Sequence, residues 1–135
     1  MKVLTVRQPY ATAILTGQKK IETRKKPTKV RGTIAIHAGL HYDMSKSDLR
    51  VRYNITTAPG EVNYVATSVY GAIIGFVDIV DCVPLASLTG LSRQEMALGD
   101  YASGVYGYVL ENPRFIRTPI FVRGQLGLWN YEVTE

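Results

Sequence analysis

Apolar and polar residues alternate at the start of the chain, and the alternation predicts a β-strand over Val3 to Val6 that ends before Pro9. Tyr10 and Ile14 then fall at helical spacing. Gly17 stands where a residue in the left-handed conformation commonly ends a helix. The pattern predicts a first strand followed by a short helix with one apolar face.

The remaining apolar runs predict further strands, because β-branched and aromatic residues dominate them and turn residues separate them. Val69 to Val83 is the densest run and is expected to form the central strand, in which Gly71 and Gly75 indicate bulges or close backbone approach. The charged segment Lys19 to Pro27 has the character of a sheet edge. The other predicted strands are Arg31 to Ala38, Val105 to Leu110, Ile120 to Val122 and Leu128 to Val133.

A second helix is predicted from Ser92 to about Tyr101, since Ser92 followed by Glu95 is a capping-box pattern. Residues 42–56 carry a weak helical pattern, and Thr56 to Asn63 is expected to be a loop. Five or six short strands cannot protect all their edges in an open sheet of this size. The predicted fold is therefore α+β: a small mixed β-barrel with two to three flanking helices.

Composition favours one globular domain over residues 1–135, because the length is ordinary for a domain and no stretch has low complexity. No apolar run approaches the roughly 20 residues of a membrane span, and the first residues lack a secretory signal pattern. Cys82 has no second cysteine with which to form a disulfide or a zinc pair. We expect a cytoplasmic protein without a metal, a cofactor or a membrane partner.

Charge is distributed unevenly along the chain. Residues 1–60 hold 12 Lys and Arg against three Asp and Glu, whereas the remaining residues hold four against eight. A clustered basic surface attracts polyanions and gains entropy from the counterions that binding releases. The asymmetry therefore favours an anionic partner, although a solvated basic face explains a charge run equally well.

Several fragments, in order along the chain, resemble the ASCH domain family of the PUA-like superfamily. The most specific is Gly17-Gln18-Lys19-Lys20-Ile21-Glu22-Thr23-Arg24, which matches the family signature Gly-x-Lys-x-x-Glu-x-Arg. The other fragments are Val6 to Ala11, Arg31 to Ala38, Tyr70 to Cys82, Leu110 to Arg114 and Gly124 to Trp129. The resemblance implies a β-barrel with flanking helices and a cleft lined by the signature.

In function, the resemblance implies an RNA-binding or RNA-processing surface. Some small bacterial relatives are amidohydrolases that remove an acetyl group from N4-acetylcytidine, and others have been proposed as ribonucleases. In the amidohydrolase-like relatives a threonine stands where this chain has Glu22. Because Thr23 is one place away, on the opposite face of a strand, a threonine nucleophile is disfavoured here, while a Lys–Glu pair that activates water remains chemically feasible.

Lys19 and Glu22 are the candidate catalytic residues, with Arg24 as a candidate anion clamp. A lysine held near other cations can have its pKa lowered into the range of a base or nucleophile. Strand alternation puts Lys19 and Glu22 on opposite faces, unless the strand starts only at Ile21, in which case all three side chains can converge. The alternative is a solvated lysine beside a surface ion pair.

Other candidates for nucleic-acid contact lie around the signature, and each has a structural alternative. Arg7, Gln8 and Tyr10 stand at a strand-to-helix junction that could hold a phosphate or form a capping turn. His37 could contact a phosphate, or it could be a hydrogen-bonded core residue. The full set is Arg7, Gln8, Tyr10, Lys19, Arg24, Lys25 and His37, with Glu95 or Asp100 as a potential third acidic catalytic group. His37 with His41 is a poor metal site, and Trp129 with Tyr131 is expected to be buried.

Three hypotheses follow. The first is a module that binds single-stranded or modified RNA, with DNA as a second nucleic-acid partner to test. The second is an RNA- or nucleoside-directed hydrolase that uses Lys19 and Glu22. The third is a protein-interaction adaptor that uses the Thr56 to Asn63 loop and a barrel edge. The oligomeric state is left open.

Overall fold

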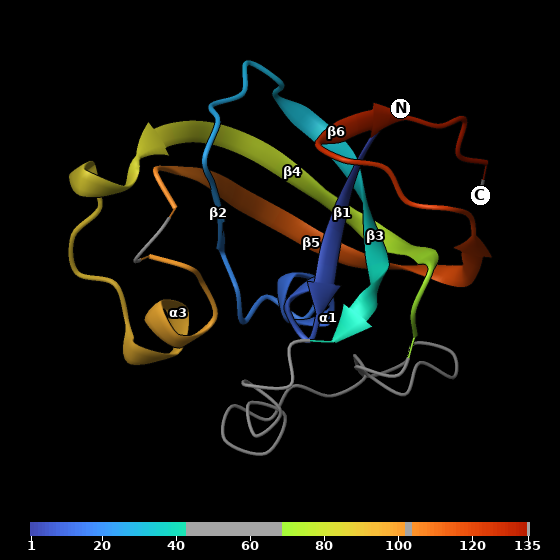
Figure 1. The fold of residues 1–135 in the computed structure, drawn as a ribbon, viewed down its shortest axis with the longest axis horizontal. Helices are drawn as coiled ribbons and strands as arrows, with labels where there is room; N and C mark the ends of the chain where they lie inside the picture. Colours follow the sequence, from blue (N-terminus) through green and yellow to red (C-terminus); the bar gives the residue numbers. More distant parts are fainter. Residues whose placement is uncertain (43–68, 102–103, 135) are drawn as a thin grey trace.

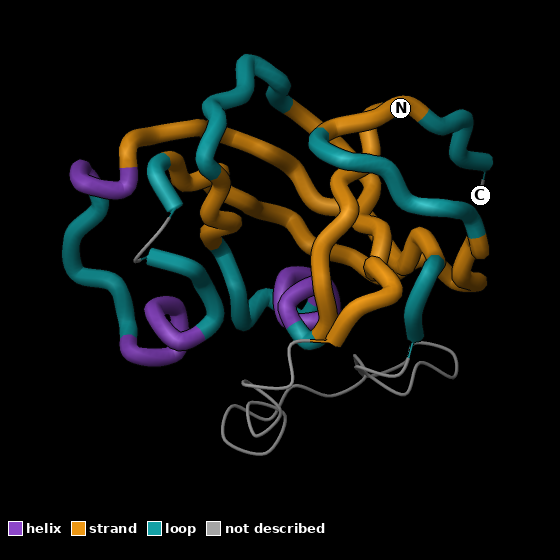
Figure 2. The backbone as a smooth tube through the Cα atoms, in the orientation of Figure 1, coloured by secondary structure: helices purple, strands orange, loops and turns teal. Residues whose placement is uncertain are grey.

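Six strands form one mixed sheet with the order β2-β5-β4-β3-β1-β6 in the computed structural model (Figure 1), which describes residues 1–42, 69–101 and 104–134. The strands are β1 (Lys2–Gln8), β2 (Ile21–Arg24), β3 (Gly32–Tyr42), β4 (Ala72–Pro84), β5 (Tyr106–Phe121) and β6 (Leu128–Asn130). The described helices are α1 (Tyr10–Leu15), the 3-10 turn η3 (Leu85–Ser87) and α3 (Arg93–Ala97), drawn as short purple segments in Figure 2. The α+β class with few helices is confirmed.

The sheet is not closed into the barrel that the sequence predicts. β2 pairs with β5 and β6 pairs with β1, so these two strands are the edges of the sheet. The amide groups of Lys20 and Ile21, at the start of β2, donate to the carboxylate of Glu95 instead of to another strand. Because β2 spans only four residues and a side chain from the α3 helix occupies this part of its free edge, the edge is protected without barrel closure.

The apolar core lies where β1, β3 and β4 meet the α1 helix. Residues 72–77 of β4 are all buried, as expected of a strand with neighbours on both sides, so the predicted central strand is confirmed. The α1 helix buries Ile14 and Leu15 against the sheet, and Gly17 follows it with a φ of 83°. The predicted first strand and helix are therefore confirmed, including the left-handed glycine after the helix.

β5 is longer than the sequence predicts. We expected separate strands on either side of Pro113 and Pro119, whereas one strand runs from Tyr106 to Phe121. The register between β4 and β5 shifts between Phe76 and Asp78. Asn112, which has a φ of 56°, and Pro113 are the residues of β5 at this shift. The register shifts again where residues 116–119 of β5 lie opposite Ile74. The strand continues because both prolines lie in bulges, where no ladder hydrogen bond from proline is needed.

Gly75 shows why the bulged strand fits against the rest of the molecule. A Cβ atom at this position would collide with the carbonyl oxygen of Arg114 and with the side chain of Leu15. The predicted close approach at Gly75 is confirmed, and it lets β5 and the α1 helix pack against the same point of β4.

The second predicted helix is shorter than expected. The α3 helix covers Arg93–Ala97 instead of reaching Tyr101, and its N-terminus is capped as predicted, with the amide of Glu95 donating to Ser92 Oγ at 3.0 Å. The Glu95 carboxylate accepts hydrogen bonds from the start of β2 instead of completing the capping box. The weak helical pattern of residues 42–56 and the Thr56 to Asn63 loop lie outside the described residues. No described helix is long and apolar enough to cross a membrane.

Candidate functional site

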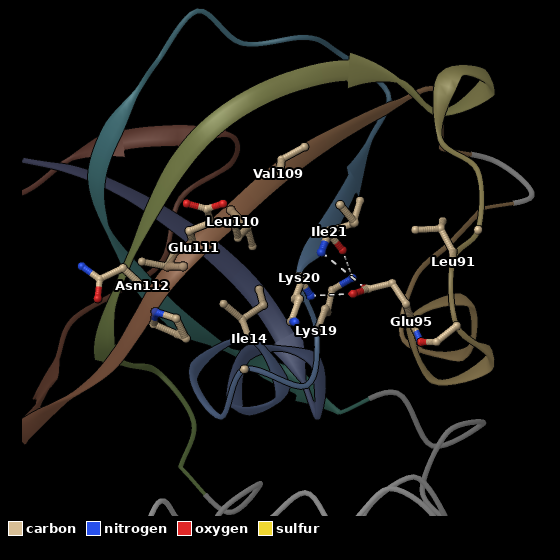
Figure 3. A pocket seen from close by; sticks show the side chains of 15 residues that line it. Ile14, Lys19, Lys20, Ile21, Leu91, Glu95, Val109, Leu110, Glu111 and Asn112 are labelled. Atoms are coloured by element: carbon tan, nitrogen blue, oxygen red, sulfur yellow. Dashed lines mark hydrogen bonds between the residues drawn. The ribbon is translucent and has the colours of Figure 1, made fainter.

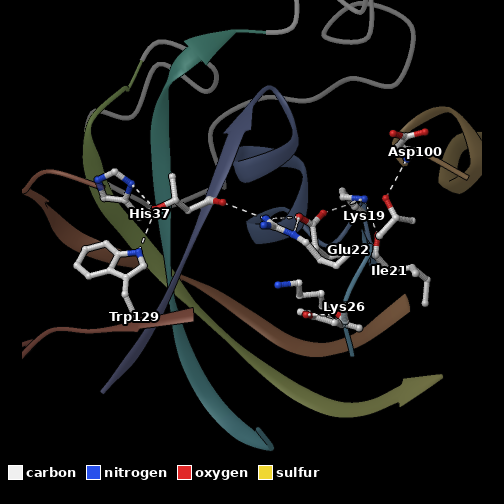
Figure 4. A network of polar contacts seen from close by, with 11 residues as sticks. Lys19, Ile21, Glu22, Lys26, His37, Asp100 and Trp129 are labelled. Carbon is white, nitrogen blue, oxygen red and sulfur yellow. Dashed lines mark hydrogen bonds and ion pairs between the residues drawn. The ribbon is translucent and has the colours of Figure 1, made fainter. Parts of the chain in front are cut away.

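The side chains of Lys19 and Glu22 lie close together beside β2 (Figure 4), and Arg24 pairs with the same Glu22 carboxylate. β2 begins at Ile21, so Lys19 lies in the preceding turn, where strand alternation does not fix its direction. Its Nζ atom lies 3.5 Å from Glu22 Oε1, and Arg24 Nη2 lies 2.7 Å from Glu22 Oε2. The convergence that the sequence allowed for a strand starting at Ile21 is present.

Lys19 is buried, with 2% of the residue exposed. Nζ donates to the carbonyl oxygen of Ile21 at 2.5 Å and lies 5.9 Å from the centre of the Tyr10 ring. Burial lowers the pKa of Lys19 below its ordinary value, against the opposing effect of the Glu22 and Glu95 carboxylates. The environment therefore makes Lys19 easier to deprotonate than a surface lysine.

Arg24 links β2 to β1 across the gap between the two strands. Its Nε and Nη2 atoms donate to Glu22 Oε2 at 2.9 and 2.7 Å, and Nη2 also donates to the carbonyl oxygen of Thr5 at 3.0 Å. The atoms that make these bonds form one edge of the guanidinium group. That edge is not free to clamp an anion, so the geometry gives Arg24 a structural task beside the site.

Glu95 reaches the same place from the α3 helix. The residue is 6% exposed, and its two carboxylate oxygens accept from the amides of Lys20 at 2.7 Å and Ile21 at 3.3 Å. Asp100, the other acidic candidate, is exposed, and its backbone amide donates to Thr23 Oγ1 at 3.0 Å. Glu95 therefore lies next to Lys19, while the Thr23 hydroxyl is bonded to the Asp100 amide.

A cavity of about 550 Å³ opens beside Lys19 (Figure 3). Its walls are mainly aliphatic, and Lys20, Glu111 and Asn112 add polar side chains. The lining residues are Ile14, Gly17, Lys19, Lys20, Ile21, Val77, Gly90, Leu91, Ser92, Glu95, Val109, Leu110, Glu111, Asn112 and Pro113. Glu22 and Arg24 do not line this cavity, so Lys19 joins the charged cluster to it.

The family model of the ASCH domain matches residues 4–117, which include most of β1 and β5, all of β2, β3 and β4, the α1 helix and the charged cluster described above. The chain belongs to the ASCH domain family. Human activating signal cointegrator 1 is 24% identical over 131 residues, which are 96% of this chain. The match spans 22% of the human protein, so this ASCH domain corresponds to about a fifth of that relative.

Solved ASCH structures share the fold. The crystal structure of ASCH from Zymomonas mobilis is 20% identical, covers 89% of this chain and 72% of its own, and has a TM-score of 0.50. A mutant of the same protein is 21% identical, covers 90% of this chain and 73% of its own, and also has a TM-score of 0.50. At this identity the likeness concerns the ASCH fold alone.

The residues at the junction of β1 and the α1 helix have different environments. Arg7 is exposed, as is Lys25 after β2. Gln8 is fully buried, its Nε2 donating to the Val69 carbonyl at 3.0 Å and its Oε1 accepting from the Thr12 amide at 3.1 Å. Both ends of the Gln8 amide are thus used within the chain, and its Oε1 accepts from an amide in the first turn of the α1 helix, which favours the structural alternative for this junction.

His37 is a core residue of the ASCH domain. It is 1% exposed, its Nε2 lies 2.6 Å from the Val122 carbonyl and its Nδ1 lies 3.3 Å from Thr5 Oγ1. The Trp129 ring packs edge-on against it with centroids 5.7 Å apart, and Trp129 Nε1 donates to the same Thr5 hydroxyl at 3.0 Å. Both nitrogens have partners and the ring is buried, so the geometry favours the structural alternative for His37.

Tyr101 is a residue near the site that sequence reasoning missed as a candidate. Its hydroxyl is buried and has no hydrogen-bond partner among the described residues. Burial raises the pKa of Tyr101, and the Glu95 and Glu22 carboxylates raise it further, which places the phenol in their field. No local pattern indicates this, because Tyr101 follows the α3 helix and reaches the cluster through tertiary packing.

Within the described residues, no group of three His, Cys, Asp or Glu could hold a metal ion.

The ion pairs of Glu22 predict that two substitutions lower the free energy of unfolding by different amounts. Glu22→Gln should lower the free energy of unfolding by about 3 kcal/mol, because it leaves the buried Lys19 ammonium without its carboxylate partner. Lys19→Met should cost less than about 1 kcal/mol, because Glu22 keeps its bonds to Arg24. Urea unfolding of both variants measures the difference, and equal costs would contradict the arrangement.

The buried His37 predicts a loss of stability in acid. Burial lowers its pKa below 6.5, so the unfolded chain takes up a proton first, and stability should fall as the pH drops from about 6.5 toward the folded-state pKa. Urea unfolding at about pH 7.5 and about pH 5.5 measures this slope. His37→Gln should flatten the dependence of stability on pH, whereas His41→Gln, at an exposed position, should leave this dependence unchanged. The reverse result would contradict the assignment of the pH dependence to His37.

Proposed function

We propose that this ASCH domain binds single-stranded or modified RNA, with one base held in the cavity beside Lys19. The observation that carries the proposal is the cavity itself: about 550 Å³, mainly aliphatic, with Lys20, Glu111 and Asn112 among its lining residues. Flipped bases are held between apolar side chains and recognised by polar groups at their edges. The association of the ASCH family with RNA binding supports the same function.

Charge supports this function as well. Lys20, Lys25 and Arg7 are exposed, and the first part of the chain carries a strong excess of Lys and Arg. Such a surface attracts the RNA backbone from a distance and releases counterions on binding. The cavity accounts for base contact and the basic residues account for affinity, so the two features serve one ligand.

RNA binding is tested with a labelled single-stranded RNA of about twelve nucleotides, a length within the usual range for such sites. Affinity should fall as salt rises, and Leu91→Trp should weaken binding about tenfold, because the indole fills the cavity that Leu91 lines. Leu126→Trp, at a position 98% exposed and outside the cavity, is the matched control. No binding at low salt, or an affinity independent of salt, would contradict the proposal.

A second candidate function is hydrolysis of N4-acetylcytidine or of RNA, and the environment of Lys19 favours it. The Lys19 ammonium lies 3.5 Å from a Glu22 oxygen, and burial lowers its pKa toward the range of a general base. A Lys–Glu pair of this kind could activate water. A threonine nucleophile is not favoured, because strand alternation directs Thr23 to the face of β2 opposite Glu22.

The hydrolase hypothesis predicts that Lys19→Ala abolishes turnover of N4-acetylcytidine or of labelled RNA, as followed by chromatography. The circular dichroism spectrum should stay unchanged, which would separate a catalytic loss from unfolding. Product formation by the wild type and not by the variant supports an enzyme. A variant with undiminished turnover would exclude Lys19 from catalysis, and binding without product would leave a recognition module.

A further inference from the structure

A basic loop joins β2 to β3 at the end of the molecule away from the α1 helix (Figure 1). Residues 25–31 read Lys-Lys-Pro-Thr-Lys-Val-Arg, and Lys25, Lys26, Lys29 and Arg31 are all exposed. None of these residues contributes to the side-chain cluster of Lys19, Glu22 and Arg24 described above, and none lines the cavity beside Lys19. The loop is thus a second concentration of positive charge, separate from the buried cluster.

Hydrogen bonds hold the backbone of this loop against the sheet and against itself. The buried Tyr108 donates its hydroxyl to the Lys26 carbonyl at 2.8 Å. Val30 donates its amide to Thr28 Oγ1 at 3.1 Å, and Arg31 Nη1 donates to the Thr28 carbonyl at 3.0 Å. Because these bonds fix the backbone, a ligand that meets the lysines has little main-chain freedom to remove.

The four cations differ in how far they are neutralised. Arg31 Nη2 lies 3.7 Å from Asp81 Oδ1, so its charge has a partner. Among the residues that the structure describes, no ion pair involves Lys25, Lys26 or Lys29. Three uncompensated lysines therefore extend from a fixed loop, and this arrangement suits a ligand with several negative charges along its length.

We propose that the β2–β3 loop is the surface along which this domain binds the phosphate backbone of RNA, with Lys25, Lys26 and Lys29 neutralising successive phosphates. The proposal rests on the RNA-binding function proposed above and extends it to a second surface. β2 connects the two surfaces, since its first residue, Ile21, lines the cavity and its last residue, Arg24, precedes the loop. The four residue-to-residue steps from Ile21 to Lys25 span roughly 13 Å of extended chain, which one strand of RNA can bridge.

The chemistry of the loop favours RNA over an anionic membrane. Surface helices and loops that enter a membrane carry exposed aromatic or aliphatic side chains beside their cations. Here Val30 is half-buried, and the Pro27 ring is the one exposed apolar group in residues 25–31. The loop offers charge and hydrogen-bond donors without an apolar group of the size that membrane insertion requires.

Salt dependence provides the test, because each neutralised phosphate of a single strand adds about 0.7 to the slope of log affinity against log salt. With the labelled RNA of about twelve nucleotides, each of Lys25→Gln, Lys26→Gln and Lys29→Gln should lower the slope by about 0.7, and the triple variant by about 2. The double variant of Lys25 and Lys29 is compared with a double variant of Arg117 and Arg123. Both double variants remove two exposed cations. Arg117 lies on β5 and Arg123 follows it, so the second variant leaves the β2–β3 loop intact.

The proposal holds if the slope of log affinity against log salt is smaller in the lysine double variant and unchanged in the arginine double variant. Equal losses in the two double variants would overturn it in favour of diffuse charge, and unchanged slopes in the lysine variants would overturn it while leaving RNA binding intact. Absence of RNA binding by the wild type would overturn both proposals. Lysine-dependent binding to phosphatidylserine vesicles in place of RNA would assign the loop to a membrane instead.

Discussion

One carboxylate, that of Glu22, holds together the part of the molecule where the sheet is incomplete. It is buried between the Lys19 ammonium and the Arg24 guanidinium, and Arg24 continues to the Thr5 carbonyl on β1. β2 and β1 thus face each other across a gap that side chains bridge and backbone ladders do not. A buried carboxylate in this position is favourable because cationic groups pair with it, the Arg24 guanidinium through two hydrogen bonds. The spacing Lys-x-x-Glu-x-Arg provides these partners from one short stretch of chain.

The strongly periodic segments could be predicted from sequence. Val3 to Val6, the helix ended by Gly17 and the central strand all follow from local pattern, and the structure contains each of them. The division of β5 at Pro113 and Pro119 was wrong, because bulges accommodate both prolines, and local pattern does not reveal which residues a neighbouring strand leaves unpaired. Barrel closure was wrong for a related reason: a side chain from the α3 helix protects the β2 edge, and such long-range pairing leaves no local signal.

The candidate site was partly predictable. Lys19, Glu22 and Arg24 were identified through one contiguous motif, and their convergence depended only on where β2 begins. The second use of Glu95, on the edge of β2, and the position of Tyr101 depend on contacts across more than seventy residues of sequence. Gln8 and His37 illustrate a different difficulty, since polar residues beside a motif suggest ligand contact, and the sequence does not show that these side chains bond to backbone and hydroxyl groups of the chain.

The pairing of Glu95 with the start of β2 also bears on self-association. An exposed strand edge is a template on which another chain can add a strand, and natural proteins cover such edges or charge them. Here a single carboxylate performs both tasks, because it occupies two edge amides and places a negative charge beside them. Loss of the short helix that carries it would leave a bare edge of β2. The short α3 helix therefore covers a part of the sheet edge that backbone pairing leaves open.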